Sequence, residues 1–315
     1  MSRLLLSIAA LLAAAPALAQ GQTTLSQPTL SPPEIVAAAP AKDWVRIAPA
    51  DLLVMDLAPA AGGPSRRVVI QLLPAPFSQG WVGNIRQLAA ARFWDGTAVV
   101  RVQDNYVAQW GDPDGEDKAL ARPLPAGLTV MPESAYTAVL PETAQVMASA
   151  ARGDSYAERA AFVAGWPVAL GRADTGDQHA WPVHCYGMVG AGRNMSPDTG
   201  TGAELYAVIG HAPRHLDRNI ALVGRVIEGI EHLSSLPRGT GPLGFYATPQ
   251  ERTAITAVRL GTELADLPAY EYLSTDSASF ARYADARANR RDAFFIRPAG
   301  GADICNIPVP VRRVK

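Results

Sequence analysis

The chain has few cysteines, a net charge close to zero and a single long apolar run. Its 315 residues carry 28 basic and 29 acidic side chains, so there is no excess positive charge of the kind that binds nucleic acid or an anionic membrane. Two cysteines without clustered histidines do not favour a structural zinc site. We therefore expect no cofactor, no metal and no nucleic-acid partner.

The one long apolar run lies at the N-terminus. Arg3 precedes an apolar stretch that starts at Leu4 and closes with the small-residue pattern Ala17-Leu18-Ala19. This order is typical of a secretory signal peptide, residues 1–19, that is cleaved after Ala19. A short membrane anchor is the alternative, but the stretch is below the roughly 20 apolar residues that a span needs. We expect a periplasmic or secreted protein without stable membrane insertion.

Cys185 and Cys305 are the only cysteines and lie 120 positions apart. In an oxidising compartment they could pair, and closing so long a loop would add at most about 4–5 kcal/mol of stability. Two separate buried thiols are equally compatible with the sequence, which leaves the pairing open.

Glycine (27 residues) and proline (26) are plentiful, which favours strands joined by turns over a helical bundle. Residues 20–45 are rich in Pro, Ser, Thr and Ala and are expected to form a flexible leader. Apolar patterns predict strands within 51–58, 66–74, 97–111, 185–192, 203–210, 219–226 and 252–261, and helices at 81–93, 227–236 and 276–292. Strands outnumber helices, so an antiparallel barrel or sandwich is favoured.

Between about residues 117 and 183 the pattern weakens, although 144–165 is compatible with a helix. Gly153-Asp154-Ser155 in this segment matches the nucleophile motif of an esterase family, but it follows a helical pattern rather than a strand. Residues 239–244 match GxGxxG, yet they follow a helix and contain a proline, which excludes a dinucleotide site. His211 and His215 have metal-ligand spacing, but Pro213 between them predicts a loop.

Arg101 stands inside the β-branched run Val99-Val100-Arg101-Val102. Side chains alternate across a strand, so Ala98, Val100 and Val102 are predicted to face the core. Arg101 is then predicted on the outer wall of a barrel. An isolated strand arginine is most commonly a solvated surface residue, so its neighbours decide its role.

The segment FWDGTAVVRVQDNYVAQWGDPDG, residues 93–115, resembles the signature region of cyclophilin-type peptidyl-prolyl isomerases. The shared features are the turn Asp95-Gly96-Thr97, Arg101, Tyr106-Val107 with Gln109, and Gly111-Asp112. Segments 68–89 and 200–236 resemble further motifs of that family in the right order. The resemblance covers roughly 50–116 and 184–262.

This resemblance implies a mainly β fold, a closed antiparallel eight-stranded cyclophilin-like barrel capped by two helices. The barrel would span residues 46–265, with a long insertion at about 117–183. Residues 266–315 would form a C-terminal extension packed on the barrel.

The resemblance also implies peptidyl-prolyl isomerisation of exported proteins. Arg101 and Gln109 would be catalytic, with the guanidinium donating hydrogen bonds to the twisted amide. An apolar pocket would hold the proline ring, and the substrate-binding positions are Tyr106, Val107, Glu204, Tyr206, His215 and Leu216. The partners would be proline-containing polypeptides, and we expect a monomer.

Several positions depart from the family pattern. Glu204 stands where the family has glutamine, and its charge could pair with Arg101. His215 replaces a tryptophan at the pocket rim, and Ile220 replaces a histidine, so we expect weak binding of cyclosporin-like cyclic peptides. The alternative function is a non-catalytic proline-peptide-binding chaperone or scaffold on the same barrel. A metal-dependent hydrolase is a third hypothesis.

Overall fold

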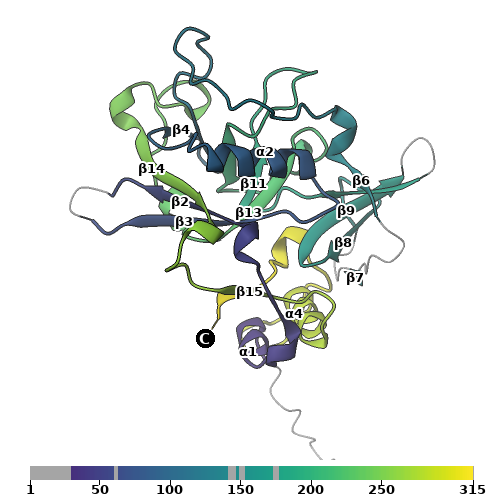
Figure 1. The fold of residues 1–315 in the computed structure, drawn as a ribbon. Helices are drawn as coiled ribbons and strands as arrows, with labels where there is room; N and C mark the ends of the chain where they lie inside the picture. The colour runs from purple at the N-terminus through teal and green to yellow at the C-terminus, as the bar shows by residue number, and fades with distance from the viewer. Residues whose placement is uncertain (1–29, 60–62, 141–146, 149–152, 173–176, 315) are drawn as a thin grey trace, which may run out of the picture.

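The computed structural model describes residues 30–59, 63–140, 147–148, 153–172 and 177–314 (Figure 1). Eight antiparallel strands close into a barrel in the order β11-β12-β5-β4-β14-β2-β3-β13. The predicted eight-stranded barrel is therefore confirmed. Its strands are β2 (Leu52–Leu57), β3 (Arg66–Leu72), β4 (Ala98–Val102), β5 (Val107–Gly111), β11 (Met188–Ala191), β12 (Leu205–Val208), β13 (Leu222–Glu228) and β14 (Thr253–Leu260).

Helix α2 (Gln79–Ala90) packs its apolar face into the barrel core. Trp81, Ile85 and Leu88 recur at helical spacing and are fully buried, as the sequence pattern predicts. The second predicted helix is much shorter than residues 227–236. Strand β13 still pairs with β3 at Glu228, so only one helical turn follows it, α3 (Glu231–Ser234).

The insertion forms a sheet of its own beside the barrel, in the order β6-β10-β9-β8-β7. Its strands are β6 (Ala138–Val139), β7 (Met147–Ala148), β8 (Arg159–Val163), β9 (Trp166–Arg172) and β10 (Gln178–Pro182), after a short 3-10 helix η3 (Glu133–Tyr136). The helix considered for 144–165 is therefore wrong. Ala164 and Gly165 both have positive φ and join β8 to β9 in a two-residue hairpin, the backbone that a tight antiparallel turn requires.

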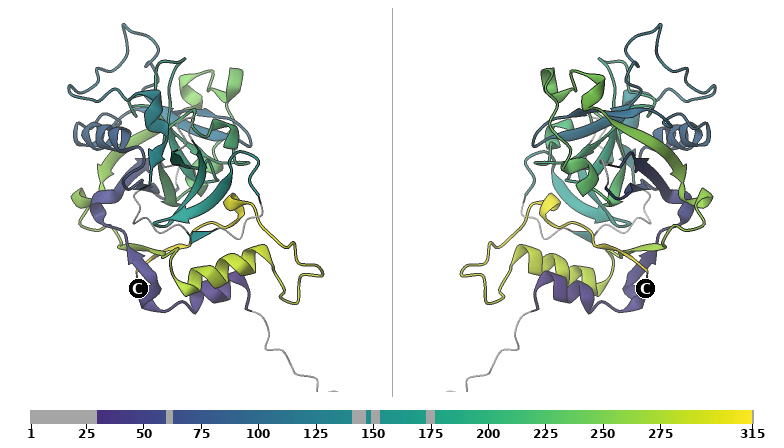
Figure 2. Two further views of the ribbon diagram at one scale, coloured as in Figure 1. Left: turned by 90° about the vertical axis from the view of Figure 1, so that its right-hand side faces the viewer. Right: turned by 90° about the vertical axis from the view of Figure 1, so that its left-hand side faces the viewer.

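Both ends of the described chain meet in a third sheet of order β1-β15-β16. Its strands are β1 (Trp44–Arg46), β15 (Tyr270–Leu273) and β16 (Val311–Arg313). Helix α1 (Pro32–Ala37) lies beside α4 (Ala278–Ala288), as Figure 2 shows. The flexible leader predicted for 20–45 is thus folded from residue 32 onward, because Ile35 is buried in the same core as Phe280.

The C-terminal extension is tied to the barrel by packing and by a covalent bond. Leu273, Phe280 and Ile304 belong to the same apolar core as the barrel strands. Cys185, just before β11, forms a disulfide with Cys305 in the extension. The two cysteines are therefore paired, which the sequence alone left open. The predicted signal peptide lies outside the described residues, and no helix within the described ranges is long and apolar enough to cross a membrane.

Candidate active site

Three predicted site residues form one row on the outer face of the barrel. Arg101 of β4 lies opposite Gln109 of β5, and Gln109 lies opposite Tyr206 of β12. The next row on the same face pairs Val107 with Val208. The register of three neighbouring strands therefore brings together residues separated by about a hundred positions in the sequence.

A β-bulge corrects the predicted orientation of β4. The pairing shifts between Val99 and Arg101, so Val100 is an extra residue with no partner in the ladder. Val99 and Val102 consequently belong to the barrel core, whereas Val100 borders an outer cavity. Strict alternation of Ala98, Val100 and Val102 into the core was wrong, although the outward position of Arg101 was right.

The Arg101 guanidinium is held by hydrogen bonds and aromatic rings. Its Nε donates to the Leu243 carbonyl at 2.7 Å, Nη1 donates to Gln109 Oε1 at 3.0 Å, and Nη2 donates to Gln103 Oε1. Its central carbon lies 5.6 Å from the centre of the Tyr106 ring and 5.2 Å from that of Phe245. Burial lowers the pKa of Arg101, yet a guanidinium remains charged at neutral pH.

These three bonds use three of the five N–H donors of Arg101. Two donors are left without a partner among the described residues, and the side chain is only part-buried. The guanidinium is thus oriented by the protein while it can still donate to a ligand.

Glu204 does not contact Arg101 directly, contrary to the expected pair. Gln109 stands between them: its Nε2 donates to Glu204 Oε1 at 2.7 Å, while its Oε1 accepts from Arg101. Burial raises the pKa of Glu204, against the opposing effects of the Gln109 hydrogen bond and the Arg101 charge. Gln109 therefore both orients Arg101 and screens it from the carboxylate.

An apolar surface lies beside Arg101, built on Val107, Tyr206 and Val208, with Tyr106 and Ile220 packed against them. These first three residues are 4 % exposed or less. The exposed His215 stacks on Tyr106, with ring centres 6.5 Å apart. Leu216, at the end of the short 3-10 helix η4 (Arg214–Leu216), is half-buried and is not part of this apolar cluster.

A cavity of about 440 Å³ adjoins the site on the Glu204 side. Val100, Glu204 and Phe245 form its border with the Arg101 row, and three arginines (Arg122, Arg193 and Arg252) contribute to its walls. A polypeptide that reached Arg101 could extend into this cavity.

The sequence did not reveal three contacts of Arg101, namely Gln103, Leu243 and Phe245. Leu243 and Phe245 belong to a turn about 140 residues further along the chain. This turn contacts β4 through an isolated β-bridge between Arg101 and Phe245. Gly244 makes this approach possible, because its φ is +80° and a Cβ there would lie 2.7 Å from Gln103 Cα. No local pattern signals such a return. No three His, Cys, Asp or Glu residues in the described ranges are grouped so that they could hold a metal.

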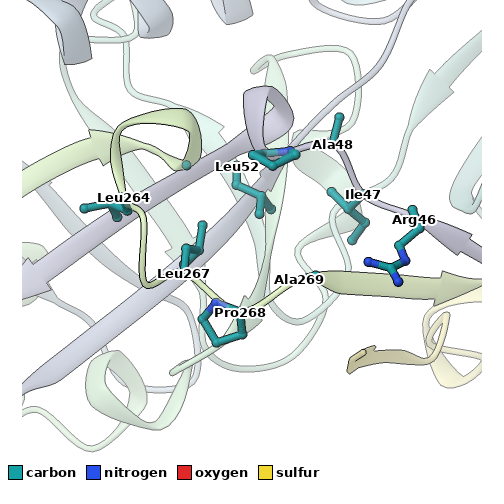
Figure 3. A pocket seen from close by; sticks show the side chains of 10 residues that line it. Arg46, Ile47, Ala48, Leu52, Leu264, Leu267, Pro268 and Ala269 are labelled. Atoms are coloured by element: carbon teal, nitrogen blue, oxygen red, sulfur yellow. The ribbon is translucent and has the colours of Figure 1, made fainter. Parts of the chain in front are cut away.

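A second cavity, of about 400 Å³, lies away from these residues (Figure 3). It is lined mainly by apolar side chains of the segments 46–52 and 261–269, with Arg46 as its one charged side chain. None of the predicted site residues lines it.

A family model described as cyclophilin type peptidyl-prolyl cis-trans isomerase/CLD matches residues 67–259. The chain belongs to this family. The match covers the barrel strands from β3 to β14 and includes the whole Arg101 row. The protein is thus a cyclophilin-type isomerase by family and by fold. Among curated proteins no match is found.

A solved cyclophilin is similar to this cyclophilin in fold. AquaCyp293 from Hirschia baltica is 20 % identical with a TM-score of 0.65, and the match covers 86 % of this chain and 94 % of that one. A cyclophilin type peptidyl-prolyl cis-trans isomerase from Cryptosporidium parvum, solved in the presence of the dipeptide Ala-Pro, is 11 % identical with a TM-score of 0.37 and covers 66 % of this chain and 98 % of its own.

Proposed function

We propose that this cyclophilin accelerates rotation about X–Pro bonds of exported polypeptides, with Arg101 as the catalytic residue. One observation carries the proposal: an oriented guanidinium with two remaining donors stands beside a buried apolar surface. The other features of the site fit the same reaction.

The reaction needs no nucleophile and no cofactor. An X–Pro amide resists rotation by about 20 kcal/mol because twisting it removes its resonance. At the twisted state the nitrogen becomes pyramidal and regains its lone pair, so a hydrogen-bond donor stabilises that state more than the planar one. Arg101 supplies such donors from a rigid, permanently charged fork.

The neighbouring groups would orient the two halves of the substrate. The surface of Val107, Tyr206 and Val208 would hold the proline ring by apolar contact. Gln109 and the Leu243 carbonyl would keep the guanidinium in place, so that little reorganisation is needed during rotation.

Replacing Arg101 by alanine tests the proposal. We expect Arg101→Ala to lower kcat/KM in a protease-coupled isomerisation assay by about 100-fold, the usual cost of losing a donor to a transition state. Arg86→Ala is the control, because Arg86 of α2 pairs with Asp51 away from the site. Equal rates for Arg101→Ala and wild type would refute the catalytic assignment.

The alternative, a non-catalytic binder of proline-containing peptides, draws support from the hydrogen bonds that Arg101 already makes within the protein. Three protein groups already accept from its guanidinium, and Glu204 is linked to it through Gln109. In that case NMR would show chemical-shift changes with a proline peptide, but exchange spectroscopy would show no faster cis–trans interconversion.

Export rests on two features of the chain. Residues 1–19 have the pattern of a secretory signal, and the Cys185–Cys305 disulfide is of a kind that persists in oxidising compartments. Cell fractionation followed by N-terminal sequencing should find the mature chain starting at Gln20 in the periplasm or the medium. A chain that starts at Met1 in the cytoplasm would contradict this.

A further inference from the structure

A buried chain of polar groups begins directly behind the apolar surface. The Tyr206 hydroxyl lies 2.8 Å from His184 Nε2, and His184 Nδ1 lies 2.9 Å from Asp217 Oδ1. The backbone N–H of His184 also donates to that carboxylate oxygen, at 3.0 Å. The side chains of His184 and Asp217 are 3 % exposed or less.

The direction of these hydrogen bonds follows from the charges. Burial lowers the pKa of His184, although Asp217 opposes this shift, so the ring is neutral at pH 7. A carboxylate can only accept, which places the one imidazole proton on Nδ1. Nε2 is then an acceptor and the Tyr206 hydroxyl donates to it. Burial also holds the pKa of Tyr206 well above 10, so the phenol keeps its proton.

Arg214 continues the chain into the insertion. Its Nε donates to Asp217 Oδ2 at 2.5 Å, and its two Nη atoms lie 2.9 and 3.1 Å from the oxygens of Asp154. The side chains of Arg214 and Asp154 are 4 % exposed or less. Burial opposes the charge of Arg214, but the two aspartates outweigh it and raise its pKa. Asp154 belongs to the Gly153-Asp154-Ser155 triplet. Its carboxylate accepts the hydrogen bonds of Arg214 in an ion pair.

Two members of this chain, Tyr206 and Arg214, belong to elements that border the proposed proline site. Tyr206 is one of the three residues on which the apolar surface is built. Arg214 is the first residue of η4, the short helix that carries His215 onto Tyr106. Gly190 of β11 gives the tyrosine room, because a Cβ there would lie 2.3 Å from the Tyr206 hydroxyl.

We propose that His184, Asp217, Arg214 and Asp154 are positioning residues of the proline-binding surface, an inference that rests on the proposed function of that surface. A phenol beside an apolar pocket must satisfy its hydroxyl, since a buried unpaired donor is costly. His184 accepts that hydroxyl on the far side, so that the proline ring meets only carbon. The two contacts of Asp154 with Arg214 hold η4 in position beside Tyr106. Through Asp154 the insertion thereby contributes to the isomerase site.

The tyrosine end of the chain can be tested by a double-mutant cycle. His184→Phe removes the acceptor and leaves the Tyr206 hydroxyl unpaired, so we expect KM for a proline peptide to rise about ten-fold with kcat little changed. Adding Tyr206→Phe removes the hydroxyl itself and should return KM to within about three-fold of the Tyr206→Phe variant. A purely structural role of His184 predicts no such rescue.

The insertion end is tested by Asp154→Asn, which weakens the contact with Arg214. We expect KM to rise about five-fold while kcat is retained. Asp56→Asn is the matched control, because Asp56 also receives two bonds from one arginine, Arg67, on strands β2 and β3 away from the site. Its KM should equal that of the wild type. If His184→Phe does not fold, the Asp154→Asn measurement decides the proposal alone.

The failures of the two proposals can be told apart. Full activity in Arg101→Ala would refute the proposed site, and this inference with it. Loss of activity in Arg101→Ala, together with unchanged KM in His184→Phe and Asp154→Asn, would overturn only the positioning role. If His184→Phe and Asp154→Asn only lowered the melting temperature and left KM unchanged, the positioning role would likewise be overturned.

Discussion

At the residue scale, Arg101 shows how one side chain meets two opposing needs. It has to be held still, which its bonds to Gln103, Gln109 and the Leu243 carbonyl achieve. The proposed catalysis also requires that Arg101 keep donors for a substrate, and part-burial allows that. The stacking of Tyr106 and Phe245 on the guanidinium adds attraction without using any N–H group.

Glu204 is the residue whose charge we expect to temper catalysis. In Glu204→Gln the Gln109 hydrogen bond can be kept, while the negative charge near the guanidinium is lost. We expect kcat/KM at pH 7.5 to rise about three-fold, because Arg101 then stabilises the twisted amide with less compensation. A fall in kcat/KM would show that the carboxylate itself supports the reaction.

The same residue should produce a pH dependence of stability. Burial raises the folded-state pKa of Glu204 above 4.5, so the folded protein holds this proton more tightly than the unfolded chain does. The free energy of unfolding should therefore fall as pH rises from the unfolded pKa through the raised folded value. Urea titrations between pH 4 and 8 should show a smaller decline in Glu204→Gln. An equal slope in both proteins would contradict the shift.

His215 is expected to govern cyclosporin binding. It stands where the family commonly has a tryptophan, and it stacks on Tyr106 at the rim of the apolar surface. We expect the wild type to bind cyclosporin weakly and His215→Trp to bind it more tightly, measured by calorimetry. A low-nanomolar complex with the wild type would contradict this expectation.

At the element scale, two irregular segments build the site on an otherwise regular barrel. The bulge at Val100 interrupts the alternation of side chains along β4, so that Val99 and Val102 both face the core. The turn before Phe245 brings its ring and the Leu243 carbonyl back to Arg101. Both depart from the ideal strand pattern at the point where a functional side chain has to be aimed.

Gly244 is the residue on which that turn depends. A side chain at Gly244 would be strained by the positive φ and would meet Gln103 Cα at 2.7 Å. Gly244→Ala should therefore cost about 1–2 kcal/mol or more in stability and lower kcat/KM several-fold, as Leu243 and Phe245 shift. Gly83→Ala on α2 is the control, because nothing lies within 4 Å of the added carbon, and it should stabilise the protein by up to about 1 kcal/mol. Melting curves and the isomerisation assay measure both effects.

At the scale of the whole molecule, additional structure supports the barrel from two sides. The insertion supplies Asp154, from the segment before β8, to the chain of polar groups behind Tyr206. The third sheet and α4 share the barrel's core through Leu273 and Phe280. The disulfide connects the extension to Cys185, the residue next to His184.

Removing this disulfide should destabilise the protein without abolishing its site. For the double variant Cys185→Ser and Cys305→Ser we expect the free energy of unfolding to fall by up to about 5 kcal/mol, since the crosslink closes a long loop in the unfolded chain. Urea unfolding of the variant should match that of reduced wild type. Unchanged stability would show that packing alone holds the extension.

The sequence by itself determined most of the elements and the family. The periodicity of apolar residues placed α2, α4 and most barrel strands, because side chains that share a face of a strand or helix recur at that element's own spacing. The motif around Arg101 pointed to Gln109 and the resemblance of segment 200–236 pointed to Tyr206, and both lie in the Arg101 row.

Only the tertiary structure decided how distant segments meet. The bulge at Val100, the sheet formed by the insertion, the approach of Phe245 to Arg101 and the contact of Asp154 with Arg214 have no local signature. Pairing the two cysteines likewise required the ends of a long loop to come together. Local patterns record which side of an element is buried, whereas such contacts depend on which elements pack against each other, a property of the whole chain.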